Sequence, residues 1–211
     1  MNLKLKFFFG VVIMTSILLG LGIKSCSKKQ NIPTSTSNNY DLILTERENA
    51  SAEKETNYLG QLINTISFNV KTDNTEFENG IQSWASIEKP QNDLKNLIDR
   101  NQIVINEDKI TVIIDYPLKN EYRFDLKSAN GFDREKLLLE ISKHYYELYE
   151  EEEKTATVKT LPMEKRTMYN RNETNGKYGV WGHDIADLVL TDIFVYKNKS
   201  GKIILALNVD S

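Results

Sequence analysis

The residues best suited to chemistry in this chain lie in the segment GKYGVWGHDIADL, at positions 176–188. Its three glycines allow the backbone to turn tightly. His183 is followed by Asp184 and Asp187, so two carboxylates accompany one imidazole. On a helical turn, His183 and Asp187 would share a face, because residues four apart are neighbours on a helix. Such a pair can ligate a divalent metal, or the aspartate can orient a catalytic imidazole.

A structural role for the same residues is the interpretation we favour. A zinc site needs three or four protein ligands, and the only other histidine, His144, lies in a different segment. We therefore predict no metal and no cofactor. His183 can instead donate to a backbone carbonyl while Asp184 caps a turn and Trp181 fills the core. Trp181, His183, Asp184 and Asp187 remain the candidate binding or catalytic residues.

Other candidate residues have simpler explanations. His144 flanks the apolar stripe of a predicted helix, which predicts a partly buried, hydrogen-bonded histidine. The carboxylates of residues 150–153 could attract calcium, but consecutive helical residues point in different directions, so we expect a solvated helix end. The chain has no GxSxG, Walker or HExxH motif. Standard hydrolase and nucleotide-binding classes therefore lose support.

Two β-hairpins are predicted around these candidates. Apolar residues alternate over 110–116 and again over 122–126, on either side of a turn. A second pair of alternating segments, 188–196 and 202–209, flanks a turn at 198–201. Each pair predicts two antiparallel strands.

A long helix is predicted between the hairpins. Asp133 can accept a hydrogen bond from the first-turn amides, and Leu138, Ile141, Tyr145 and Leu148 form one apolar stripe. The sequence therefore predicts an α+β fold, in which an antiparallel sheet built from hairpins packs on one long amphipathic helix.

The stretch 27–56 is mostly polar and cannot bury enough surface to offset its ordering entropy. We expect residues 26–57 to form a flexible tether, followed by a single domain at 58–211, a usual domain size. Tyr40 and the apolar residues 42–44 interrupt the tether. This patch either docks on the domain or forms a transient local cluster, and we favour the cluster.

The N-terminus has the features of a signal peptide. Lys4 and Lys6 precede an apolar run at 7–23, and Ile23-Lys24-Ser25-Cys26 closes it. Residues 1–26 resemble the leader of bacterial lipoproteins. The resemblance implies that the signal peptide 1–25 is removed and that Cys26 carries a lipid. Alternatively, the apolar run is an uncleaved single-pass anchor, since a span needs about 17–25 apolar residues.

Either alternative ties the chain to a membrane. The lipoprotein resemblance implies a place in the bacterial cell envelope, and Ser27 after Cys26 resembles lipoproteins that are forwarded to the outer membrane. The single-pass alternative would leave the protein in the inner membrane. Cys26 is the only cysteine, so a lipidated protein has no thiol left for a disulfide.

Charge and motifs leave two classes of function. Three of the 27 basic residues lie in the leader, so 24 basic against 30 acidic residues remain, which disfavours nucleic acid as a partner. We predict a non-catalytic binding domain whose contact region is the polar segment 154–175 together with the Trp181 segment, with a possible protein partner in the envelope. The alternative is a small envelope hydrolase with His183 as general base or metal ligand and Asp184 or Asp187 as its orienting carboxylate.

Overall fold

The computed structural model describes residues 35–52, 56–166 and 169–211, except for the side chains of 35–38. Backbone contacts divide the chain into residues 1–33 and a compact unit over Thr34–Ser211. The expected signal peptide and the lipidated Cys26 lie outside the described residues. Among the described helices, none combines the length and apolar composition that crossing a membrane requires.

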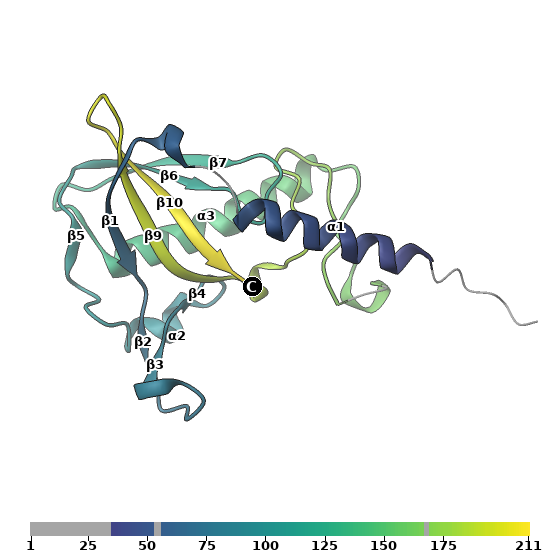
Figure 1. Cartoon of the computed structure of the whole chain (residues 1–211), viewed down its shortest axis with the longest axis horizontal. Helices are drawn as coiled ribbons and strands as arrows, with labels where there is room; N and C mark the ends of the chain where they lie inside the picture. Colours follow the sequence, from purple (N-terminus) through teal and green to yellow (C-terminus); the bar gives the residue numbers. More distant parts are fainter. Residues whose placement is uncertain (1–34, 53–55, 167–168) are drawn as a thin grey trace, which may run out of the picture. The chain divides into compact units, whose positions relative to one another are not determined.

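A mostly antiparallel sheet forms the centre of the unit (Figure 1). In the described part of the chain it has six strands, in the order β1-β9-β10-β6-β7 with β4 also on β9. The pairings are antiparallel except for the parallel pair β10 and β6. The bounds are β1 (Gln61–Ser67), β4 (Ala85–Ser86), β6 (Lys109–Ile114), β7 (Tyr122–Lys127), β9 (Val189–Lys197) and β10 (Ile203–Asp210).

Both predicted hairpins are confirmed. Strands β6 and β7 pair antiparallel, with Ile110 opposite Leu126. Strands β9 and β10 pair antiparallel along their length, with Leu205 opposite Val195. The alternation that predicted them also gives the sheet two different faces, because successive side chains of a strand point to opposite sides.

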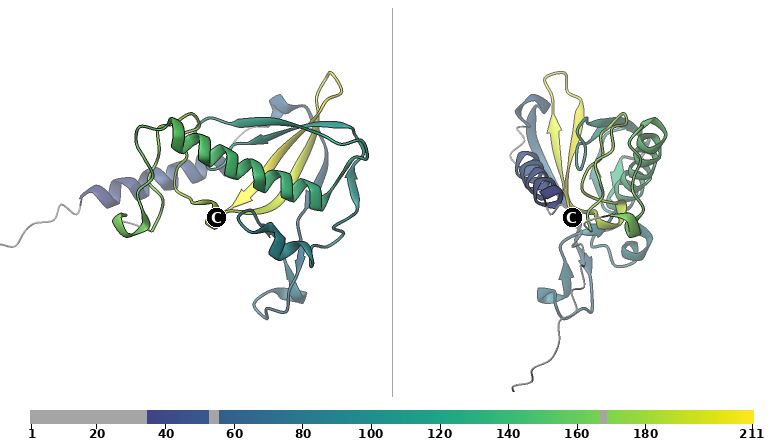
Figure 2. Two further views of the ribbon diagram at one scale, coloured as in Figure 1. Left: turned by 180° about the vertical axis from the view of Figure 1, so that it is seen from behind. Right: turned by 90° about the vertical axis from the view of Figure 1, so that its right-hand side faces the viewer.

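Two long helices lie in the described residues, where the sequence analysis expects one. Helix α3 (Arg134–Thr155) is capped at its N-terminus by Asp133, whose Oδ1 accepts a 2.8 Å hydrogen bond from the Lys136 amide as predicted. Helix α1 (Ser35–Ala52) has 18 residues. Figure 2 shows α3 on one side of the sheet and α1 on the other.

The predicted flexible tether at 26–57 is wrong for the residues of α1. Leu44 is 7% exposed and belongs to the main core, so the apolar patch docks on the domain. The compact unit begins at Thr34 and not at 58. Local composition could not predict the docking of α1, because its partners, such as Glu173 and His183, stand much later in the chain.

The two faces of the sheet bury different amounts of apolar surface. The face toward α3 carries the main core, which includes Leu138, Ile141 and Tyr145 of the helix. The second face carries a small cluster of Leu59, Ile113, Tyr196 and Ala206, with Phe194 and Ile204 packed against it.

Short elements complete the described fold. They are η1 (Asn57–Leu59), β2 (Val70–Lys71), η2 (Glu78–Gly80), β3 (Ile81–Gln82), α2 (Pro90–Leu94), β5 (Ile103–Ile105), β8 (Phe132–Asp133), η3 (Met163–Lys165) and η4 (Ile185–Asp187). Strands β2 and β3 pair with each other, as do β5 and β8.

Candidate functional site

The carboxylate of Glu152, near the end of α3, positions the candidate segment. Its Oε1 accepts hydrogen bonds from the Thr174 hydroxyl at 2.7 Å and the Gly176 amide at 2.8 Å. Its Oε2 accepts from the amides of Tyr178 at 2.7 Å and Gly179 at 3.1 Å. Burial of the fully enclosed side chain raises the Glu152 pKa, but these hydrogen bonds outweigh it and hold the pKa below 4.5.

The expected solvated helix end at 150–153 is therefore wrong for Glu152. One side chain of the acidic run turns inward, because backbone donors of the returning loop offset its desolvation. Gly176 is required for this approach: a Cβ there would lie 2.6 Å from the Glu152 carbonyl oxygen. Within the acidic run, Glu152 therefore has a structural role, because it fixes the start of segment 176–188.

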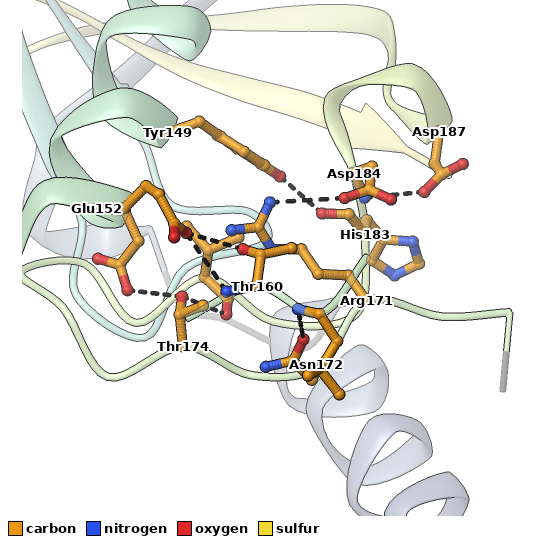
Figure 3. Close-up of polar contacts among 12 residues, drawn as sticks. Tyr149, Glu152, Thr160, Arg171, Asn172, Thr174, His183, Asp184 and Asp187 are labelled. Carbon is orange, nitrogen blue, oxygen red and sulfur yellow. Dashed lines mark hydrogen bonds and ion pairs between the residues drawn. The ribbon is translucent and has the colours of Figure 1, made fainter. Parts of the chain in front are cut away.

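His183 meets a carboxylate that the sequence analysis did not consider. Its Nε2 lies 2.8 Å from Oε1 of Glu48, on helix α1. The imidazole stacks on the ring of Tyr116, with centroids 5.6 Å apart, and its side chain is 13% exposed. The Tyr116 hydroxyl donates to the same Glu48 carboxylate at 3.1 Å. The Tyr149 hydroxyl donates to the His183 carbonyl oxygen at 2.9 Å (Figure 3).

The two candidate aspartates engage other groups. The Asp184 carboxylate pairs with Arg166 at 2.6 Å and lies 3.5 Å from Arg171. The Asp187 carboxylate accepts the Asp184 amide at 2.8 Å (Figure 3). The expected pairing of His183 with Asp187 is not formed. The short turn considered for residues 184–188 does form as η4, with Asp184 at its N-cap, but His183 precedes that turn and so does not share a helical face with Asp187.

Trp181 belongs to the core. Its ring is 3% exposed and meets Tyr116 edge to face at a centroid distance of 5.4 Å. The Arg47 guanidinium of α1 lies over it at 5.9 Å. Trp181 therefore takes the core-filling role that the sequence analysis favoured, and it is not part of an exposed contact region.

His144 is confirmed as a partly buried, hydrogen-bonded histidine. Its Nδ1 lies 2.8 Å from the Tyr122 hydroxyl and 2.9 Å from Glu147. Its ring stacks on Phe124 at 3.6 Å. Burial lowers the His144 pKa and outweighs the opposing charge of Glu147.

The groups around His183 do not form a nucleophilic triad. The Ser211 hydroxyl lies 3.5 Å from Nε2 of His183 and 2.9 Å from the Tyr116 hydroxyl. In a triad the carboxylate binds Nδ1 and the nucleophile binds Nε2. Here Glu48 and Ser211 approach the same nitrogen, so the Glu48 carboxylate holds the position from which the imidazole would accept a proton.

Glu48, Tyr116 and Ser211 were missed by sequence reasoning. Glu48 stands in a polar stretch without a motif, and 135 residues separate it from His183. No spacing rule connects such distant positions. Within the described residues, no group of three or more His, Cys, Asp or Glu side chains is placed to hold a metal ion.

A cavity of about 330 Å³ lies between α1 and the second face of the sheet. Glu48 and Ser51 line it from the helix, and Phe194, Ala206 and Asn208 line it from the strands. Its wall therefore combines apolar surface with polar groups, as small binding sites do.

Comparison of the chain with protein-family models, with curated proteins and with solved structures finds no match.

Replacing Glu152 by glutamine should lower the free energy of unfolding by about 1–3 kcal/mol at pH 7, because buried donors lose a charged acceptor. The folded-state pKa is below 4.5, so the carboxylate stabilises the fold above that pH and ceases to do so as pH falls through the folded value. The wild-type and variant stabilities should therefore converge in acid. Urea denaturation at successive pH values measures both effects.

The matched control is Glu150→Gln, two residues earlier in the same acidic run, where the side chain is 67% exposed. It should leave the unfolding midpoint nearly unchanged. Equal midpoints for the Glu152 and Glu150 variants would contradict a special role for the buried carboxylate.

Truncating Trp181 to alanine should cost about 3–5 kcal/mol of stability, the usual range for removing a buried aromatic side chain. Thermal melts compare it with Trp84→Ala, which removes a partly buried ring in edge-to-face contact with Phe77. We expect a much larger drop in Tm for Trp181→Ala. A melt equal to wild type would mean that the Trp181 ring is exposed in solution.

Proposed function

We propose that this chain is a membrane-tethered exported lipoprotein of the bacterial cell envelope, lipidated at Cys26, with a non-catalytic binding domain over Thr34–Ser211. The leader at 1–26 supports the tether, by its resemblance to lipoproteins. The outer membrane is the destination that Ser27 favours. The partner that fits this location is another envelope protein.

The observation that carries the binding role is the second face of the sheet. Strands β1, β9 and β10 face the viewer in Figure 1, and α1 passes near one end of that face. Phe194 and Ile204 on it are partly exposed, and Leu62 on the edge strand β1 is 49% exposed. Half-exposed apolar side chains on a rigid sheet are typical of interaction surfaces.

The cavity under α1 gives this face a recess in which a partner can anchor. Phe194 lines both the face and the cavity, and Glu48, Asp115 and Asp210 add carboxylates at its edge. A partner side chain with an apolar stem and a cationic head matches such a lining, because its stem packs on the aromatic ring while its charge meets the carboxylates. The acidic balance of the chain is consistent with a protein partner and not a nucleic acid.

The second candidate is a small envelope hydrolase. It is favoured by the grouping of His183, Tyr116 and Ser211, of which Tyr116 lines the same cavity. In that function His183 would act as general base. Glu48 opposes it, since the carboxylate occupies the Nε2 side of the imidazole. We therefore rank binding first.

Lipidation is tested by growing cells with radiolabelled palmitate. We expect the wild-type chain to incorporate label and Cys26→Ser to lose it, because the thiol is the acceptor. Label that persists in Cys26→Ser, or a wild-type chain without label, would refute the lipid anchor.

Binding is tested with a photo-crosslinking amino acid at Leu62 or Phe194. We expect an adduct of one defined mass in intact cells. The control position is Tyr146, which is 47% exposed but lies on α3, on the other side of the sheet. The adduct should persist in His183→Asn. An adduct at Tyr146 as strong as at the test positions, or no adduct at either test position, would count against a binding face. If no adduct forms and His183→Asn loses a cellular phenotype, the hydrolase is favoured.

A further inference from the structure

We propose that the loop after α3, described at residues 158–166 and at Tyr169, rests on the surface of the lipid bilayer that holds the anchor. The inference builds on the proposed lipidation of Cys26. It assigns the loop a lipid surface as its ligand, and it leaves the second face of the sheet free for the protein partner.

The loop concentrates exposed apolar side chains. Val158 is 49% exposed, Leu161 43%, Met163 55% and Tyr169 79%. Eleven large apolar side chains are exposed within the described residues, and these are four of them. The loop therefore holds a far larger fraction of the exposed apolar side chains than of the residues. Such a concentration indicates an interaction site, whereas single exposed apolar residues are ordinary.

The loop backbone is held in place by its own polar contacts. Oδ1 of Asn172 accepts the Leu161 amide at 2.7 Å, and its Nδ2 donates to the Lys159 carbonyl at 3.1 Å. Oδ1 of Asn175 accepts the Val158 amide at 2.7 Å. Val158 and Leu161 therefore project from a backbone that is already fixed by hydrogen bonds, and docking does not have to order this part of the loop.

The loop lies beside the part of α1 that is nearest to the anchor in the chain. The Tyr40 hydroxyl, in the first half of α1, donates to the Arg171 carbonyl at the end of the loop region. Figure 1 shows this light green region beside the start of α1, and β5 at the opposite end of the unit. Figure 2 shows the same arrangement from behind.

The length of the connecting chain limits how far the membrane can be. Eight residues, 27–34, separate Cys26 from Ser35 at the start of α1. A fully extended chain spans about 3.3–3.6 Å per residue, so the lipid attachment lies within roughly 30 Å of that helix end. The connection is therefore short enough for the end of the unit that carries the loop to reach the bilayer.

The side chains of the loop suit the interface between water and lipid. Tyrosine is favoured at the level of the headgroups, and leucine and methionine can enter the acyl boundary. Lys165 lies among them and can meet lipid phosphates. A folded protein partner is the alternative occupant, and the experiment below separates the two.

The test uses the full-length lipidated protein in vesicles of phosphatidylethanolamine and phosphatidylglycerol. Cys26 is the only native cysteine and is consumed by acylation, so Met163→Cys supplies one thiol for a fluorescent label. Lipids with a spin label near the headgroup should quench the dye strongly. Tyr169→Cys is the second test position, in case the first variant does not fold.

The control is Ile103→Cys on β5, which is 46% exposed and lies at the other end of the unit. Its dye should show no quenching above that in vesicles without spin label. Equal quenching at 163 and 103, or none at 163 and 169, would overturn the proposal. Protection of the dye from a water-soluble quencher in native membranes, but not in pure lipid, would also overturn it and identify a protein as the occupant.

The same samples separate this inference from the proposed function. Absence of the acyl chain in the mass of the intact protein would refute the lipid anchor itself. A protein that carries the acyl chain but shows no selective quenching at the loop would leave the anchor in place and refute only the docking of the loop.

Discussion

The carboxylate of Glu152 fixes the region that carries the candidate residues. It is fully buried at the end of α3, and it accepts hydrogen bonds from the Thr174 hydroxyl and from amides of the chain that returns past the helix. A buried carboxylate is costly unless such donors surround it, so helix end and loop constrain each other. From this point the chain runs to Trp181 and His183, whose positions depend on the same attachment.

Helix α1 is held on the domain mainly by polar contacts. Among the side chains of α1 that the structure describes, Leu44 is the buried apolar one. Glu48 contacts His183, and Arg47 pairs with Glu173 at 2.7 Å. Gly182 allows this approach, since a Cβ there would stand 3.3 Å from Leu44. The imidazole that seemed suited to catalysis thus serves as an attachment point for helix α1. The position of α1 therefore depends on side chains that stand more than a hundred residues later in the sequence.

Features whose interacting residues are close in the sequence could be predicted, and features whose partners are distant could not. The Asp133 cap and both hairpins could be predicted, because a cap and an alternating strand depend on residues a few positions apart. The sequence could not predict that His183 pairs with Glu48 and not with Asp187, because Glu48 lies on a segment whose composition predicted no structure. The inward turn of Glu152 was also hidden, since its donors are more than twenty residues away.

The sequence by itself determined the mostly antiparallel α+β architecture and the two hairpins. It did so because these features follow from local periodicity and capping. Only the tertiary structure decided that α1 is a docked helix, that Trp181 is core, and that His183 pairs with Glu48. These outcomes depend on which distant segments pack together, since burial and hydrogen-bond partners are properties of the whole fold and not of neighbouring residues.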